Sequence, residues 1–272
     1  MFGVQWRAIQ REAQLAAVQA AHGATVLRRA NHAQVGRYTE AFFALSISLE
    51  RMGKLIFLAD HVINTGNFPK DQDLRAIGHD LNTILDKCET IGANVKPDRN
   101  YSSPLNDPIH IGIKEVLSLF ATKLRYYNLN YLVGTGQTQK DPIALWWEIV
   151  ATPIIKKHFS SHRREKAEKG AALMESLLGD RSIVLHSTES SQSINDISKF
   201  WAHGQATQVV QKYGQLYTLQ IIRWLSSLIY ELSIIGAYEK RVEALLGLNE
   251  PFEIFLNNDT YLRGRKTWTV YM

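Results

Sequence analysis

The longest amphipathic stretch of the chain, residues 194–245, limits the fold more than any other feature. Its apolar residues recur every three or four positions, as they do along one face of an α-helix. They are Val210, Tyr213, Leu216, Tyr217, Ile221, Trp224, Leu228 and Leu232. The spacing predicts one long helix, with Gly204, Gly214 and Gly236 as candidate interruptions. Together with the shorter helices described next, it indicates an all-α fold.

Six more helices are predicted from the same spacing and from start and stop signals. They cover about residues 5–34, 36–64, 71–91, 107–133, 143–159 and 165–178. Asp107-Pro108 and Asp141-Pro142 are strong starts, because Asp caps a helix and proline is pre-set for the first turn. Pro153 falls inside one of these helices and is expected to kink or break it near Thr152.

Two segments lack helical spacing and are predicted loops. They are residues 92–107, which contain two prolines, and residues 187–193, which are polar. Glycine-rich residues 134–137 mark the best boundary between an N-terminal bundle, residues 1–135, and a C-terminal helical region, residues 136–272. A chain of 272 residues can form two domains or one continuous domain, so both arrangements stay open.

Residues 250–272 alternate between apolar and polar side chains instead of following a helical period. The apolar positions are Phe252, Ile254 and Leu256, then Trp268, Val270 and Tyr271, separated by Asn257-Asn258-Asp259. We expect a small β-hairpin here. Since two short strands alone are marginal in water, this hairpin would have to dock on the helices.

The composition indicates a globular protein without a membrane span. Apolar residues make up 45% of the chain, which is enough for a substantial core. The apolar stretch 224–235 contains Glu231 and is shorter than the ~20 residues needed to cross a bilayer. Arg7, Arg11 and Glu12 interrupt the region in which a secretory signal needs an apolar core, so we expect a cytoplasmic protein.

The single cysteine, Cys88, cannot form an intramolecular disulfide, which fits a reducing cytoplasm. One interpretation of this residue is a catalytic thiol. The interpretation that we prefer is a small buried or half-buried side chain on a helix.

Three stretches in a fixed order resemble a known superfamily. They are Glu50-Arg51-Met52-Gly53-Lys54-Leu55 in one helix, Gly78-His79-Asp80-Leu81 opening another, and the apolar helix Leu117–Leu129 with its pair Arg125-Tyr126. Over residues 20–135 this arrangement resembles the HEPN superfamily, especially members near the abortive-infection V group. The resemblance implies an antiparallel bundle of four to five helices, here extended by further C-terminal helices, and usually a dimer. It also implies either a metal-independent endoribonuclease of a toxin–antitoxin or antiviral system, or a binding module that has lost catalysis.

HEPN ribonucleases carry an arginine followed, after four to six residues, by a histidine. The arginine polarises the scissile phosphate, and the histidine transfers protons while the RNA 2′-hydroxyl attacks. Arg125, where the resemblance would place this motif, has no histidine within reach. Arg181 and His186 have the required spacing outside the resembling half and are our candidate catalytic pair, although a helix-end cation and a loop residue would look the same. Arg28 and His32 are one residue too close and rank lower.

The polar residues of the resembling motifs have two interpretations. The resemblance implies that Glu50, Lys54, His79, Asp80 and Arg125 support an active site. In the structural interpretation, Glu50 and Lys54 fix the helix register. Asp80 would then stabilise the positive end of a helix dipole while His79 hydrogen-bonds a neighbouring helix, and we favour this role for the two residues.

A basic segment follows at residues 156–169. Its cations are Lys156, Lys157, Arg163, Arg164, Lys166 and Lys169, against only two acidic residues. Such a cluster neutralises phosphates and releases counterions, which is the sequence-independent part of nucleic-acid affinity. We take the first five cations as candidate RNA-binding residues, although a solvated helix face explains the same pattern.

No sequence motif predicts a metal or a cofactor. The chain has no C-x-x-C, H-E-x-x-H, calcium loop, P-loop or glycine-rich dinucleotide loop, so we expect neither. Trp201 and His203 form a further cluster beside Gly204, which we interpret as a core tryptophan and a hydrogen-bonded histidine.

These observations favour a HEPN-like protein that acts on or with RNA in prokaryotic defence or growth control. The alternative is a non-catalytic helical module that binds a protein partner or nucleic acid, and a small-molecule enzyme is a third class. Apolar surface around Trp146-Trp147 and residues 221–235 predicts a homodimer, because large apolar patches usually mark interfaces.

Overall fold

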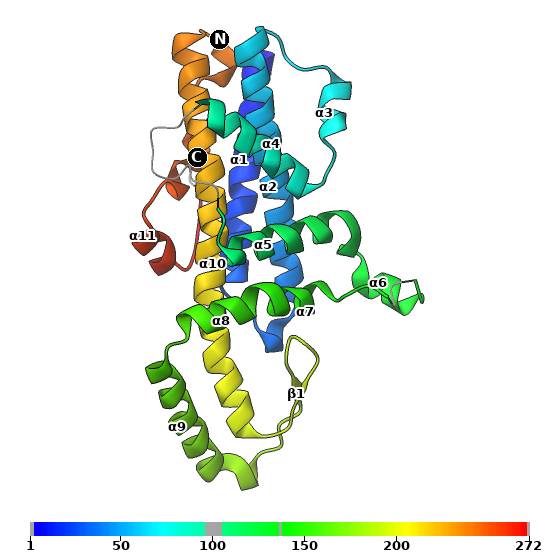
Figure 1. Ribbon diagram of the computed structural model, residues 1–272, viewed down its shortest axis with the longest axis vertical. Coiled ribbons are helices and arrows are strands. Elements are labelled where there is room, and N and C mark those ends of the chain that lie inside the picture. The colour runs from blue at the N-terminus through cyan, green and yellow to red at the C-terminus, as the bar shows by residue number, and fades with distance from the viewer. Residues whose placement is uncertain (1–2, 96–104, 136–137, 271–272) are drawn as a thin grey trace.

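A computed structural model, which describes residues 3–95, 105–135 and 138–270, shows an elongated bundle of helices (Figure 1). The α-helices are α1 (Val4–Leu27), α2 (Gly36–Thr65), α3 (Asp71–Ile77), α4 (Leu81–Val95), α5 (Pro108–Leu119), α6 (Tyr127–Leu132), α7 (Pro142–Trp146), α8 (Thr152–His158), α9 (Ser161–Leu178), α10 (Ile197–Ile234) and α11 (Asp259–Gly264). The 3₁₀ helices are η1 (His32–Gln34), η4 (Gly179–Arg181), η6 (Glu243–Leu245) and η7 (Glu250–Phe255), and the π-helical turns are η2 (Phe120–Leu124), η3 (Trp147–Ala151) and η5 (Ile235–Glu239). Strands β1 (His186–Ser187) and β2 (Ser193–Ile194) form a two-stranded antiparallel sheet. The predicted all-α class is confirmed.

The helices α1, α2 and α10 run side by side along the molecule, and the shorter helices pack across them (Figure 1). α10 continues for 38 residues through Gly204 and Gly214 and ends in the π-helical turn that contains Gly236. α1 and α2 approach closely, because the buried face of α1 is rich in alanine. Gly23 also permits this approach, since a Cβ there would lie only 2.6 Å from Leu45 Cγ. One apolar core includes residues from both halves of the chain. None of the described helices is long and apolar enough to span a membrane.

The predicted helix over residues 71–91 is two helices. Gly78 takes a φ of 70°, which turns the chain between α3 and α4. The Asp80 carboxylate then accepts a hydrogen bond from Thr83 N, 3.3 Å away, at the start of α4. The neighbouring predicted loop, residues 92–107, lies partly outside the described residues.

The break that Pro153 was expected to cause near Thr152 is a π-helical turn. A proline inside a helix lacks the N–H and clashes with the carbonyl four residues earlier. The turn η3 widens the helix just before α8 begins at Thr152, so the chain continues without an interruption. Thr152 Oγ1 donates to the Trp147 carbonyl at 2.8 Å and stabilises the widened turn.

The described part of the C-terminal tail contains two short helices where we expected a hairpin. Residues 250–255 form η7, and Asn258 caps α11 by accepting a hydrogen bond from Tyr261 N at 2.9 Å. Burial follows a three-residue interval rather than the alternation: Phe252 and Phe255 are both fully buried, whereas Ile254 and Leu256 are partly exposed. The small sheet lies instead at β1 and β2, around the segment that we predicted as a loop. Tyr271 lies outside the described residues.

The aromatic pair from which we predicted a dimer surface is buried inside the chain. Trp146 is 0% exposed and Trp147 is 8% exposed. One group of exposed apolar side chains lies on and just after α6, which projects from the body (Figure 1): Leu129, Leu132 and Val133 are 61%, 79% and 73% exposed. A second group follows α9, where Ile183 and Leu185 are 89% and 84% exposed. These two tryptophans therefore give no reason to expect a dimer, which remains an implication of the HEPN resemblance.

Cys88 is expected to be unreactive in the folded protein. It is buried on α4, and burial raises the pKa of its thiol to about 12. Only the thiolate is nucleophilic, so at pH 8 almost none of the reactive form is present. Ellman's reagent should label the urea-unfolded chain rapidly and the native chain only as fast as it opens. Rapid labelling of the native protein would contradict this burial.

Candidate functional site

A cavity of about 920 Å³ lies between the end of α1, the helix α9 and the first half of α10, with the C-terminal segment on one side. Its cations are Arg28, Arg29, Arg163, Lys166, Lys212 and Lys266. None of the described residues that line it is acidic. We call it the basic cavity.

The local sequence explains the wall that α9 forms. Ser160 caps α9 by accepting a hydrogen bond from Arg163 N at 3.4 Å. From this start, residues 163, 166 and 170 follow at intervals of three and four and share one face of the helix. Gly170 has a specific role, because a Cβ there would lie 2.8 Å from the Trp201 indole nitrogen. The missing side chain lets Trp201 approach α9 from α10.

The opposite wall joins three segments that are far apart in the chain. Arg29 Nη2 donates to Thr267 Oγ1 at 3.1 Å, which ties the end of α1 to the C-terminal segment. Gln211 Nε2 donates to the Ala30 carbonyl at 2.9 Å, which ties the same residues to α10. These two hydrogen bonds place cations from the three segments around one space.

The cations of the basic cavity repel one another. Burial lowers the pKa of Lys212, and the charges of Arg263, Arg163 and Arg28 lower it further. Burial also lowers the pKa of Arg28, whose Nη1 is buried without a hydrogen-bond partner among the described residues. An uncompensated group of like charges costs the fold stability. A bound anion would neutralise it.

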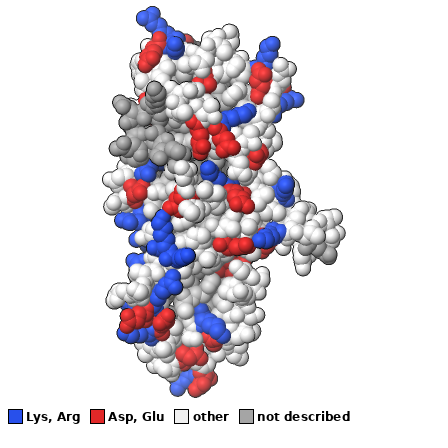
Figure 2. Space-filling model, in the orientation of Figure 1, with Lys and Arg blue, Asp and Glu red and all other residues white. Residues whose placement is uncertain are grey.

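Two of the five candidate RNA-binding residues, Arg163 and Lys166, line the basic cavity. Arg164 instead donates to the carbonyls of Phe159 and Ile155, at 2.9 and 3.3 Å, and so satisfies the end of α8. The other two are on α8: Lys157 pairs with Asp107, and Lys156 is exposed. Figure 2 shows blue Lys and Arg side chains gathered at the lower left of this face, over α8 and the start of α9.

Three of the supporting polar residues form one network. Glu50 receives hydrogen bonds from Lys54 at 2.8 Å and from His79 Nδ1 at 2.9 Å. Burial alone would raise the pKa of Glu50, but these hydrogen bonds outweigh it and lower the pKa. The network therefore joins the middle of α2 to the segment before α4. Gly53 is part of this contact, because a Cβ there would lie 2.2 Å from Ile84 Cγ2 on α4.

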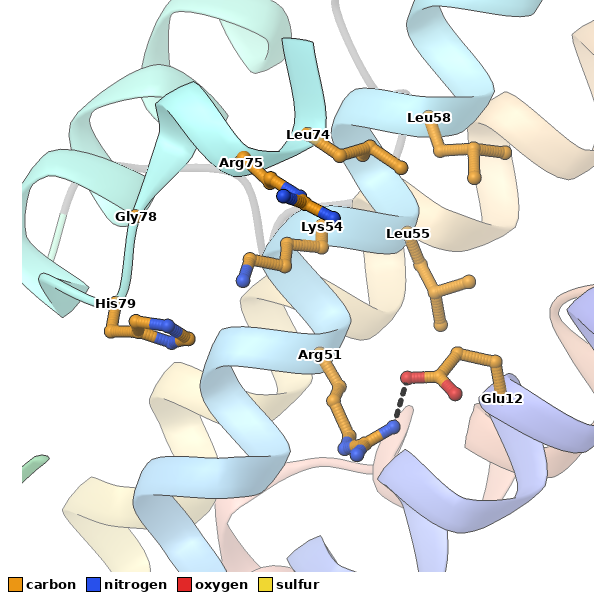
Figure 3. A pocket seen from close by; sticks show the side chains of 9 residues that line it. All are labelled: Glu12, Arg51, Lys54, Leu55, Leu58, Leu74, Arg75, Gly78 and His79. Carbon is orange, nitrogen blue, oxygen red and sulfur yellow. Dashed lines mark hydrogen bonds and ion pairs between the residues drawn. The ribbon is translucent and has the colours of Figure 1, made fainter. Parts of the chain in front are cut away.

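A small cavity of about 440 Å³ lies beside that network (Figure 3). In the figure, Arg51 of α2 pairs with Glu12 of α1, while Lys54 and His79 lie on the side of α3 and α4. Its lining is mainly apolar and combines both charge signs, unlike that of the basic cavity.

The other two supporting residues are engaged elsewhere. The hydrogen bonds from Ser118, at 2.5 Å, and from Thr83 lower the pKa of Asp80 and hold it at the start of α4. The Arg125 guanidinium lies 5.6 Å from the centre of the Phe43 ring. The geometry of Asp80 is what the structural interpretation predicts.

The candidate catalytic pair is not joined by any contact among the described residues. Arg181 is exposed in η4, at the end of α9. His186 is exposed in β1, where its ring lies 5.7 Å from that of His32 and 5.2 Å from that of Phe200, centre to centre. The structure therefore groups His186 with other imidazoles.

These imidazoles surround a buried carboxylate. Glu189, which is 3% exposed, accepts a hydrogen bond from the Tyr38 hydroxyl at 3.2 Å and lies 2.7 Å from His203 Nε2. The Tyr38 hydroxyl in turn accepts a hydrogen bond from the Trp147 indole at 3.2 Å. The His32 ring packs against His203 with ring centres 5.1 Å apart, and we call His32, Glu189 and His203 the histidine–glutamate cluster.

The pKa shifts in the histidine–glutamate cluster follow from its burial. Burial lowers the pKa of His32, so its ring is neutral near pH 7. Burial also raises the pKa of Tyr38 well above its ordinary value, so its hydroxyl stays protonated and can donate to Glu189.

Sequence reasoning missed most of this group. Glu189 lies in a segment that we predicted only as a loop, and His32 ranked low because of its spacing from Arg28. His203 is hydrogen-bonded, as we interpreted it. Trp201 is 37% exposed and lines the basic cavity, so the interpretation as a core residue was wrong. One signal was available, because Trp201, His203 and Gln205 occupy alternate positions at the start of α10. Trp201 and Gln205 line the basic cavity, and His203 belongs to the histidine–glutamate cluster.

Comparisons with known proteins do not assign a family to the chain. No protein-family model, curated protein or solved structure matches it. The HEPN resemblance therefore stands on the residues quoted above, and function must be inferred from the geometry of the site.

Proposed function

We propose that this protein binds RNA in the basic cavity. The observation that carries the proposal is a set of six cations, from four separate segments, around one cavity whose described lining has no acidic residue. Phosphates would neutralise these cations and release counterions, which is a strong and sequence-independent source of affinity. The choice of RNA over other polyanions, and a role in prokaryotic defence or growth control, come from the HEPN resemblance.

The aromatic lining favours single-stranded RNA. Trp201 is 37% exposed at the cavity, and Phe159 also lines it. Unpaired bases stack on such rings, and each stacked base contributes roughly 1–3 kcal/mol. A paired strand keeps its bases stacked on one another, so we expect duplex RNA to bind more weakly.

Reversing the α9 cations should weaken RNA binding. The double variant Arg163→Glu/Lys166→Glu should bind a labelled single-stranded RNA at least about tenfold more weakly, since tenfold corresponds to only about 1.4 kcal/mol. The dependence of log K on log salt should flatten by about 0.7 for each lost phosphate contact. Fluorescence anisotropy over a salt series measures both quantities.

The matched control is Lys240→Glu/Arg241→Glu. It reverses one lysine and one arginine that are exposed beyond the other end of α10. The pair is about 40 Å from Lys212, given a rise of about 1.5 Å per residue, and therefore lies beyond several screening lengths. Equal loss of affinity in the two double variants would show that net charge, rather than the basic cavity, binds RNA.

RNA cleavage is a second candidate, favoured by the imidazoles next to the basic cavity. Arg28 and Arg29 line the cavity three or four residues before His32, and His203 lies between two further lining residues, Trp201 and Gln205. The same RNA, incubated with EDTA and analysed on a gel, separates cleavage from binding. His186 is the exposed imidazole of this group, with its ring centre 5.7 Å from that of His32. His186→Ala should abolish metal-independent cleavage and leave binding intact, whereas uncut RNA with the wild type would favour the non-catalytic module.

A further inference from the structure

We infer that the histidine–glutamate cluster is a binding site for one zinc ion. Its three donors are the ring nitrogens of His32 and His203 and a carboxylate oxygen of Glu189, and these ligand atoms lie within 4.8 Å of one another. Two imidazoles and one carboxylate are a common protein ligand set for zinc, with a fourth position open to water or another ligand. The inference goes beyond RNA binding and uses none of the residues that line the basic cavity.

His32 carries the strongest reason for a ligand. Both of its ring nitrogens are buried, and neither has a hydrogen-bond partner among the described residues. A buried polar atom left without a partner costs roughly 1–3 kcal/mol. A metal ion bonded to one of these nitrogens would remove part of that cost.

The carboxylate is positioned as metal ligands usually are. Its side chain is fully buried, and Oε1 accepts the hydrogen bond from Tyr38, which is itself held by Trp147. Outer hydrogen bonds of this kind orient ligands and tune the metal. Oε2 faces His203 Nε2 at 2.7 Å, so an ion would replace the proton that these two atoms share.

The three donor atoms must move closer together to bind one zinc ion. Zinc bonds to N and O of about 2.0–2.2 Å, in a tetrahedron, place donors about 3.4 Å apart. The donor atoms of the cluster lie within 4.8 Å of one another. Rotation of the His32 side chain, which is on the short helix η1, would bring its ring nitrogen closer to the other two donors. His186, whose ring centre lies 5.7 Å from that of His32, is exposed and is our candidate for a fourth ligand.

Zinc binding can be measured without any activity assay. After treatment with a chelator, the purified chain is titrated with Zn²⁺ in a competition assay with a chromogenic chelator. A parallel titration with Co²⁺ is followed by visible absorption, which reports tetrahedral coordination. We expect one ion per chain, a rise in melting temperature with added Zn²⁺, and strong visible absorption for the Co²⁺ form.

His32→Gln is the decisive variant, because this side chain has no described hydrogen bond to lose and the fold should survive. It should bind Zn²⁺ at least about a hundredfold more weakly and show no zinc-dependent rise in melting temperature. Glu189→Gln, which keeps the shape of the side chain, should have the same effect. Far-ultraviolet circular dichroism checks that both variants fold.

The matched control is His22→Gln. His22 Nε2 lies 2.9 Å from Glu40 Oε1 and forms a second His–Glu pair. This pair is exposed, and among the described residues no third metal-ligating side chain groups with it. The His22→Gln variant should bind zinc like the wild type. Equal affinity of the wild type and His32→Gln, or an equal loss in His22→Gln, would overturn the site. Both results are independent of RNA binding, so either proposal can fail without the other.

Discussion

Replacing Lys212 by Gln is expected to stabilise the protein and to weaken RNA binding in the same variant. Lys212 lies in the basic cavity, and three arginines lower its pKa in addition to burial. Removing the charge relieves that repulsion, so thermal unfolding at pH 7 should shift upward by about 1–3 °C, for a gain below ~1 kcal/mol. RNA affinity should fall by about tenfold, because one phosphate contact is lost.

The pH dependence gives this prediction a second test. A lysine with a lowered pKa in the folded state is charged at a cost to the fold, and that cost is fully present below its folded pKa. The cost disappears as the pH rises through the folded pKa toward the ordinary value of 10.5. The stability gain of Lys212→Gln should therefore be present at pH 7 and shrink in alkaline buffer.

Lys240→Gln is the control for both measurements. Lys240 is exposed beyond the far end of α10, so the same change in charge should alter neither stability nor RNA affinity by much. Loss of stability in Lys212→Gln would mean that the cations of the basic cavity do not repel one another. Unchanged RNA affinity would remove Lys212 from the binding site.

Gly112→Ala is expected to destabilise the protein by about 1–3 kcal/mol, the usual range for overpacking a well-packed site. A Cβ on Gly112 of α5 would lie 2.6 Å from the backbone carbonyl oxygen of Ile149 in η3. A backbone atom cannot rotate away as a flexible side chain can. The clash should therefore exceed the ~1 kcal/mol that alanine normally adds to a helix. The midpoint of urea unfolding measures the net effect.

Gly204→Ala, by contrast, is expected to stabilise the protein. Gly204 lies within α10, and a Cβ there would have no atom within 4 Å among its described surroundings. Only the helix propensity remains, so the variant should gain up to ~1 kcal/mol. If both variants moved in the same direction, the close contact between α5 and η3 would not be the cause.

The long helices could be predicted from sequence because their apolar spacing is a local property. The 3.6-residue period is visible along α2 and α10 without knowledge of their neighbours. Breaks within helices were harder, since the positive φ of Gly78 and the π-helical turn before Pro153 depend on how the chain packs. The alternating tail was misinterpreted for a related reason. Its buried phenylalanines face the core from a six-residue 3₁₀ helix, and the apolar pattern of so short a helix is hard to distinguish from that of a strand.

The sites were only partly predictable, because their residues come from distant segments. Arg163 and Lys166 stand in a basic run and were named as candidates, whereas Arg28, Lys212 and Lys266 come from three distant segments that tertiary packing brings to the same cavity. The histidine–glutamate cluster carried even less signal. Its members belong to η1, the β1–β2 connection and α10, and no short motif spans such separations.

The walls of the basic cavity come from near both ends of the described chain, which sets an order of assembly during synthesis. α1 and α2 form a local hairpin that can pack as soon as both have been made. Lys266 and Thr267 follow Arg29 by more than 230 residues, which takes roughly 12–46 s at about 5–20 residues per second. The basic cavity is therefore incomplete during most of synthesis, and any ligand site that it forms is completed only after Thr267 has been added to the chain.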